Sequence, residues 1–231
     1  MKKVRTRASR VWSMLLVVAM LLTMLPTVAF AAESPQTIYV NASDQGTAPD
    51  GSENNPYTEI AAAVEAADDG DTIKVVAVEG DEYEPFELAN LENLTIEGIS
   101  DTYGNKPVIK TNYAESPVTV YQGCGAVVPG LGMDGLRLIG LEFKNYGYSD
   151  AWYSSSIALN GNTGANVSGA VIDSCDFTVA ENALHKPNYA AFLNTDTFTF
   201  TNNKVVGYNN GVVCMADGST LNTVTIMGNT F

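Results

Sequence analysis

The stretch LRLIGLEF, from Leu136 to Phe143, decides the fold, because four altered copies of it occur elsewhere in the chain. Each copy has apolar residues at its first and third positions and usually an apolar or aromatic residue at its eighth. Successive copies begin 42, 34, 28 and 26 residues apart. The other copies are LTIEGISD from Leu94, AVIDSCDF from Ala170, FTFTNNKV from Phe198 and VTIMGNTF from Val224.

The spacing of the copies distinguishes two kinds of β structure. In a β-sandwich, a turn joins two strands about every 8 to 12 residues. The copies in this chain begin 26 or more residues apart. Such spacing is typical of a solenoid, in which each coil stacks its apolar face on the next. We therefore predict an all-β parallel β-helix, with the first and third residues of the copies in two inward rows. Further strands are predicted at Val118–Tyr121, Ser156–Leu159, Tyr189–Leu193 and Gly211–Met215.

The sixth position of the copies, which we call the ladder position, changes along the chain. It is apolar in the early copies and asparagine in the last two. A stacked asparagine at a bend can form hydrogen bonds with its equivalents in the coils above and below, which provides partners for buried amides. The ladder residues are Ile99, Leu141, Cys175, Asn203 and Asn229.

The segment before the repeats has a different composition. Residues Glu33 to Asp101 contain 17 acidic residues and one basic residue, Lys74. The pattern predicts a strand at Thr37–Val40 and another at Thr72–Val78. Between them, apolar residues at helical spacing predict a helix over Pro56–Ala67 that begins at its proline.

This segment and the first copy resemble a known family. The stretches Ile38–Asn41, Asn55–Val64, Gly70–Val75 and Asn93–Gly98 are similar to the N-terminal cap and first coils of right-handed parallel β-helix proteins of the pectin-lyase-like superfamily. The resemblance implies a right-handed parallel β-helix whose apolar end is covered by an N-terminal capping helix. It divides the chain after residue 31 into a cap, residues 32–92, and β-helix coils, residues 93–231.

Residues 1–31 have the features of a secretory signal peptide. Five basic residues in the first ten positions precede the apolar run Met14–Leu22 and the small-x-small site Ala29–Ala31. The apolar run is shorter than the roughly 20 residues of a membrane-spanning helix, which weakens the alternative of a retained anchor. We expect cleavage after Ala31 and a secreted or cell-surface protein without a membrane segment after cleavage.

Charge and composition exclude several partners and mechanisms. Acidic residues outnumber basic ones 26 to 12, so a nucleic-acid partner is not expected. A single histidine, His185, cannot build a multi-histidine zinc site. The cysteines Cys124, Cys175 and Cys214 are too few and too scattered for a disulfide framework, and we expect buried thiols.

No complete catalytic set is visible, so whether the protein is an enzyme stays open. Asn194–Asp196 matches a catalytic run of the polygalacturonases in the superfamily, but the matching position one coil later holds two amides, Asn209 and Asn210. A calcium-dependent lyase site needs carboxylates and a lysine or arginine on a strand that faces a groove. The strands Ser156–Leu159 and Tyr189–Leu193 carry no charge. If the protein is an enzyme, a polysaccharide lyase or a glycoside hydrolase is expected.

Three loops are the best candidates for a binding site, because equivalent loops of successive coils lie side by side in a solenoid. Exposed aromatic rings beside amides and carboxylates suit the apolar faces and hydroxyl groups of sugars. In the alternative, Trp152 and Tyr153 only fold back over the flank of the solenoid. The predicted glycan-binding residues are Tyr148, Asp150, Trp152, Tyr153, Glu181 and His185.

The sequence implies no cofactor apart from a calcium ion, which the oxygen atoms of Asp44–Glu53 could hold without EF-hand spacing. The sequence stops at Phe231, in the last apolar position of a copy, although solenoids need polar caps at both ends. We expect it to be part of a longer protein, unless a dimer covers this face. The function predicted is a β-helix module that binds or processes polysaccharide or another glycan; the alternative is a non-catalytic surface scaffold or adhesin.

Overall fold

The structure is a computed structural model of the chain. It describes residues 34–44, 46–88, 91–112, 134–151, 154–159, 168–193, 195, 197–214 and 223–231. Residues Pro35–Phe231 form a compact unit. The predictions for the signal peptide, for the strand Val118–Tyr121, for Cys124, for Asn194 and Asp196, and for Trp152 and Tyr153 concern residues outside the described ranges.

The strands form three sheets, and every pair of neighbouring strands is parallel. The first sheet contains β1 (Thr37–Val40), β2 (Thr72–Val76), β3 (Thr95–Ile99), β5 (Arg137–Ile139), β8 (Ala170–Asp173), β11 (Thr197–Thr201) and β14 (Thr223–Met227), in that order. The second sheet contains β4 (Val108–Thr111), β6 (Glu142–Asn145), β9 (Asp176–Val179) and β12 (Lys204–Val205). The third contains β7 (Ser155–Leu159), β10 (Tyr189–Leu193) and β13 (Val212–Cys214).

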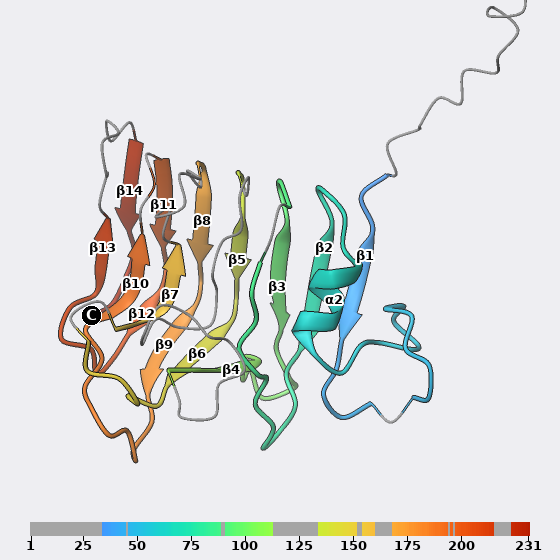
Figure 1. Ribbon diagram of the computed structural model, residues 1–231, viewed down its shortest axis with the longest axis horizontal. Coiled ribbons are helices and arrows are strands. Elements are labelled where there is room, and N and C mark those ends of the chain that lie inside the picture. Colours follow the sequence, from blue (N-terminus) through green and yellow to red (C-terminus); the bar gives the residue numbers. More distant parts are fainter. Residues whose placement is uncertain are drawn as a thin grey trace, which may run out of the picture. The chain divides into compact units, whose positions relative to one another are not determined.

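The chain visits the three sheets in turn, which confirms the predicted β-helix. Three successive coils run β5–β6–β7, β8–β9–β10 and β11–β12–β13, and each strand pairs with its equivalent in the next coil (Figure 1). The structure is mostly β, with one short helix among the described residues. Such stacking buries an apolar face that a single coil would expose to water.

The predicted inward rows form as expected in the coils before the last. Pairing places Ile96, Leu138, Ile172 and Phe200 in one row, and all four are fully buried. Burial of each such side chain contributes roughly 1.5 to 3 kcal/mol of transfer free energy. Aromatic residues of the second sheet add to this core, since the rings of Phe143 and Phe177 stack with centroids 5.3 Å apart.

Each repeat copy from Leu136 onward folds as a corner between two sheets. In the copy from Leu136, β5 ends at Ile139 and β6 begins at Glu142. The residue before the ladder position has a positive φ, a conformation that favours glycine and asparagine. The φ values are 65° for Gly140, 54° for Ser174, 56° for Asn202 and 69° for Gly228.

The first copy departs from this pattern. There β3 continues to Ile99, which pairs with Val76 and is only partly buried. The chain reaches the second sheet at Val108, after a loop in which the Asp101 carboxylate accepts hydrogen bonds from Asn105. Because this loop replaces the tight corner, Ile99 does not occupy a ladder position, and the ladder begins at Leu141.

The ladder asparagines bond to the backbone of the preceding coil, and not to one another as the sequence suggested. Asn203 Oδ1 accepts from the Cys175 N–H at 2.8 Å, and Asn203 Nδ2 donates to the Ile172 carbonyl at 3.0 Å. Asn229 makes the same two contacts with Asn203 N–H and the Phe200 carbonyl, both at 2.8 Å. Backbone groups at a corner have no strand partner, so these amides satisfy them.

The helix α2 (Ile60–Ala66) covers the inner side of β1 and β2 (Figure 1), as the predicted capping helix should. It begins four residues later than Pro56, the predicted start. Backbone hydrogen bonds explain the later start of the helix. Tyr57 N–H donates to the Tyr39 carbonyl, and Asn41 N–H donates to the Tyr57 carbonyl. The residues before α2 are therefore extended along the free edge of β1, and the helix buries Ile60, Ala63 and Val64.

Candidate functional site

Three loops between the second and third sheets lie side by side, as predicted. We call them the corner loops; their described parts are residues 146–151, 180–188 and 206–211. The first two are joined by hydrogen bonds from His185 N–H to the Gly147 carbonyl at 2.9 Å and from Asn188 Nδ2 to the Ala151 carbonyl at 3.0 Å. The third joins the second through Asn210 N–H and the Asn188 carbonyl, at 2.7 Å.

A glycine makes the close contact of the first two corner loops possible. Gly147 has φ 60°, and a Cβ at this position would lie 1.9 Å from the His185 carbonyl oxygen. No side chain fits in that space without moving the backbone. The close approach of the two loops at this point is therefore a contact between their main chains.

The structure brings the described candidate residues to this one group of loops. Tyr148 and Asp150 lie in the first corner loop, and Glu181 and His185 lie in the second. All four are exposed; the Tyr148 side chain has a 53% exposed fraction. Two further candidates, Trp152 and Tyr153, lie outside the described residues. The corner loops therefore offer an exposed ring, two carboxylates and an imidazole from successive coils.

A second feature, which the sequence analysis missed, lies on the outer face of the second sheet. A hollow of about 410 Å³ is bounded by the turn after β2, by the loop after β3 and by β4 and β6. We call it the β4–β6 groove. Its charged lining residues are Glu79, Asp81, Glu82, Asp101, Lys106, Glu142 and Lys144.

The lysines of the β4–β6 groove are held by carboxylates. Lys144 Nζ lies 2.6 Å from Glu82 Oε1, and Lys106 Nζ lies 2.7 Å from Asp176 Oδ1. The Tyr146 hydroxyl also donates to Glu82, at 2.5 Å. Glu82 belongs to the cap and its partners belong to a coil, so these bonds connect the two parts of the unit.

The ionisation of these groups favours binding over proton transfer. Partial burial opposes ionisation of Glu82, but hydrogen bonds from Lys144 and Tyr146 dominate and lower its pKa. The hydrogen bond to Glu82 raises the pKa of Lys144, and partial burial with the same carboxylate raises the pKa of Tyr146. A general acid or base works best with a pKa near the working pH. Each of these shifts moves the pKa of the group further from neutral pH.

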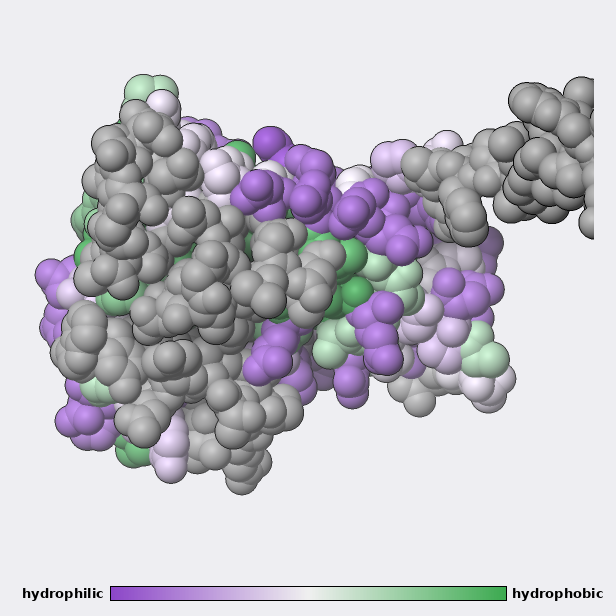
Figure 2. Space-filling view, turned by 45° about the horizontal axis from the view of Figure 1, so that its top comes forward, coloured by the Kyte–Doolittle hydropathy of each residue, from purple (hydrophilic) through white to green (hydrophobic). Residues whose placement is uncertain are grey.

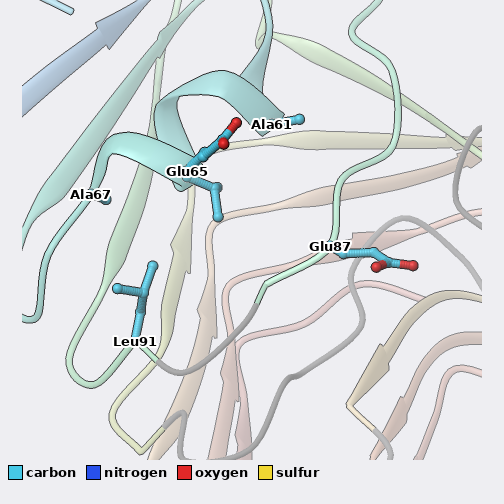
Figure 3. A pocket seen from close by; sticks show the side chains of 6 residues that line it. Ala61, Glu65, Ala67, Glu87 and Leu91 are labelled. Atoms are coloured by element: carbon cyan, nitrogen blue, oxygen red, sulfur yellow. The ribbon is translucent and has the colours of Figure 1, made fainter.

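A smaller hollow of about 300 Å³ lies beside α2. Ala61, Val64, Ala67 and Leu91 form its apolar part, while Glu65 extends from the helix and Glu87 from the segment opposite (Figure 3). Figure 2, which views the molecule obliquely, shows hydrophobic residues at the surface bordered by hydrophilic ones. The lining side chains include no hydrogen-bond donor, so this hollow suits a hydroxyl-rich ligand less well than the corner loops do.

In the loop Asp44–Glu53, where the sequence allows a calcium ion, two carboxylates accept hydrogen bonds from the protein backbone. Asp44 accepts a hydrogen bond from Gly46 N–H at 2.6 Å, and Asp50 accepts one from Ser52 N–H at 2.9 Å. The bonds with Ser52 lower the pKa of Asp50. In the described part of the chain, no group of three carboxylate, histidine or cysteine side chains could hold a metal ion.

The described cysteines carry free thiols. Cys175 is fully buried, and burial raises its pKa to about 12. Burial also raises the pKa of the partly buried Cys214. Thiolate is the reactive form, so neither residue has the character of a nucleophile.

Comparisons with known proteins do not identify a relative. No protein-family model, no curated protein sequence and no solved structure matches the chain. None of the helices in the described ranges has the length and apolar character needed to cross a membrane.

Proposed function

We propose that the protein is a secreted or cell-surface β-helix module that binds a glycan through the corner loops. The observation that carries this proposal is the hydrogen-bonded alignment of three loops from successive coils, which places exposed groups of complementary kinds on one part of the surface. Sugars combine apolar ring faces with many hydroxyl groups, so they suit an exposed tyrosine beside carboxylates and an imidazole.

Two features of the sequence and one of the fold support the same proposal. The signal-like residues 1–31 are consistent with export, and the cap resembles that of the pectin-lyase-like superfamily, whose members act on polysaccharides. The parallel β-helix agrees with that resemblance at the level of the fold. We therefore propose glycan binding as the role of the corner loops.

The test uses the mature chain from Ala32 on a glycan array, followed by titration of each bound glycan. Tyr148→Ala should weaken binding about fivefold, because a ring contact is worth roughly 1 kcal/mol. Trp152→Ala should weaken binding by at least as much. Circular dichroism should show that both variants keep the fold.

A matched control is Tyr39→Ala, which removes a partly exposed ring from the first sheet and should leave affinity unchanged. Equal losses in the control and in Tyr148→Ala would contradict a site at the corner loops. If the array shows no bound glycan, the scaffold or adhesin alternative replaces this proposal. Turnover of a bound glycan would contradict the assignment of a purely binding role.

A further inference from the structure

We propose that the β4–β6 groove makes the protein selective for glycans that carry protonated amino groups, and that it rejects polyanionic glycans such as polyuronates. This inference rests on the proposed function, because it concerns the charge of the ligand that the corner loops bind. Two observations support it. The lysines of the groove are paired with carboxylates, and the groove lies on strand β6, which leads into the corner loops.

The described lining residues of the groove include no lysine outside an ion pair with a carboxylate. Among its described lining residues, Lys144 is paired with Glu82, and Lys106 is paired with Asp176. Each pair is already neutral and lies within hydrogen-bond distance, so an anionic sugar would have to displace a carboxylate of the protein. Such an exchange gains little, because one charge-assisted hydrogen bond only replaces another.

The carboxylates, in contrast, exceed the lysines. Glu79 and Asp81 are exposed at the turn after β2, and within the described part of the chain neither carboxylate takes part in a hydrogen bond or an ion pair. Asp101 faces the same hollow, and hydrogen bonds from Asn105 lower its pKa. The carboxylates that line the groove thus outnumber its lysines, and protonated amino sugars carry the opposite charge. A hollow lined by one sign of charge concentrates ligands of the opposite sign.

Strand β6 connects the groove to the corner loops. Glu142 and Lys144 lie in β6 and line the groove, while Tyr146 follows the strand and bonds to Glu82. Tyr148 and Asp150 come next in the chain, in the first corner loop. The bond between Tyr146 and Glu82 places the start of the first corner loop beside the groove, so an oligosaccharide held at Tyr148 can extend along β6 into it.

The experiment compares three oligosaccharides of equal length by titration at low salt and weakly acidic pH. They are partially de-N-acetylated chitin, fully N-acetylated chitin and oligogalacturonate. The oligomer with amino groups should bind about tenfold more tightly than its acetylated counterpart, and oligogalacturonate should bind least. The preference should decrease as salt is added, because mobile ions screen exposed charges.

Two variants distinguish the effect of the groove on binding from the effect of the net charge of the chain, which is −14. The double variant Glu79→Gln/Asp81→Asn should lose most of the preference for amino groups. The control Glu53→Gln/Glu87→Gln removes the same charge from exposed positions outside the groove and should keep it. Equal losses in both variants would assign the preference to net charge and overturn the role of the groove.

The remaining outcomes distinguish this inference from the function on which it rests. Equal affinity for the two chitin oligomers, or tighter binding of oligogalacturonate, overturns the charge selectivity while the proposed glycan binding stands. Failure of all three oligomers to bind, with a glycan array that is also negative, overturns the proposed function and the inference with it.

Discussion

Two neighbouring buried serines, Ser155 and Ser156, differ in the hydrogen bonds that their hydroxyl groups make. Ser156 Oγ lies 2.9 Å from Thr111 Oγ1 and 2.6 Å from the Tyr208 hydroxyl, and it accepts from Asn145 Nδ2 at 3.0 Å. Burial raises the pKa of Tyr208, so its hydroxyl stays protonated in this network. Ser155 is equally buried, but among the described residues its Oγ has no hydrogen-bond partner. A buried hydroxyl without a partner loses its hydration and gains nothing in return.

This contrast predicts opposite results for the same substitution. Ser156→Ala should lower the free energy of unfolding by about 1 to 3 kcal/mol, because it leaves the partners of Ser156 unsatisfied in a buried place. Ser155→Ala should leave the stability unchanged or raise it by up to about 1 kcal/mol. Urea denaturation of the two variants beside the wild type is the measurement. Equal destabilisation by both would show that Ser155 has a partner in the folded protein.

At the scale of the elements, the corner is the unit that repeats. The ladder asparagine holds the corner of one coil to the corner before it, and its two hydrogen bonds use both ends of the amide. Leu141 and Cys175 fill the same position in earlier coils and are fully buried. An amide therefore replaces an apolar contact at a position where the backbone groups of the preceding corner need partners.

Removal of a ladder amide should destabilise the structure according to its burial. Asn203→Ala should cost about 2 to 3 kcal/mol of unfolding free energy, because the Cys175 N–H and the Ile172 carbonyl become buried groups without partners. Asn229→Ala should cost less, since Asn229 is only partly buried. Amide hydrogen exchange provides the check, with faster exchange expected at Cys175 in the Asn203→Ala variant. Retained protection there would contradict the bonding described.

The element scale also shows which parts of the structure the sequence could predict. Stacked apolar rows and aligned loops follow from the repeat itself, because equivalent residues of successive coils must superpose. A bend was expected at the ladder position, but the strand that follows it in the second sheet was not. As a result the charges on the second sheet were overlooked, although Lys110, Glu142 and Lys144 alternate with buried Ile109 and Phe143 in the period expected of a strand.

The charge pairing in the groove could not be derived from periodicity at all. Glu82 and Lys144 are 62 residues apart and come from different kinds of structure, a cap turn and a coil. Neither residue belongs to a motif. The start of α2 was missed for a similar reason, because the tertiary contact of Tyr57 with β1 overrides a local helical pattern.

At the scale of the whole molecule, the last coil differs from those before it. Its residues pair in register with β11, so Val224 and Ile226 continue the two inward rows. Their exposed fractions are nevertheless 39% and 49%, whereas Phe198 and Phe200 in the same rows are buried. Met227 and Phe231 are also exposed, at 66% and 69%. Exposed apolar groups that lie close together favour association.

The chain from Ala32 to Phe231 should therefore be poorly soluble and should associate through this coil. The double variant Val224→Thr/Ile226→Thr should shift sedimentation velocity profiles toward monomer. The control Leu184→Thr/Val206→Thr also replaces two exposed apolar side chains, but elsewhere on the surface, and should not produce this shift. A monodisperse monomer of the unmodified chain would show that something covers the coil.

The asparagine contacts favour an order in which the coils of the β-helix form, from the N-terminal coil onward. Each ladder amide reaches toward the N-terminus and bonds to groups of a coil that has already been formed. A chain that emerges N-terminus first can thus lay each coil on a finished template, starting from α2. Loss of β14 would break only the ladder bonds that Asn229 makes, and the bonds of Asn203 to the coil before it would remain.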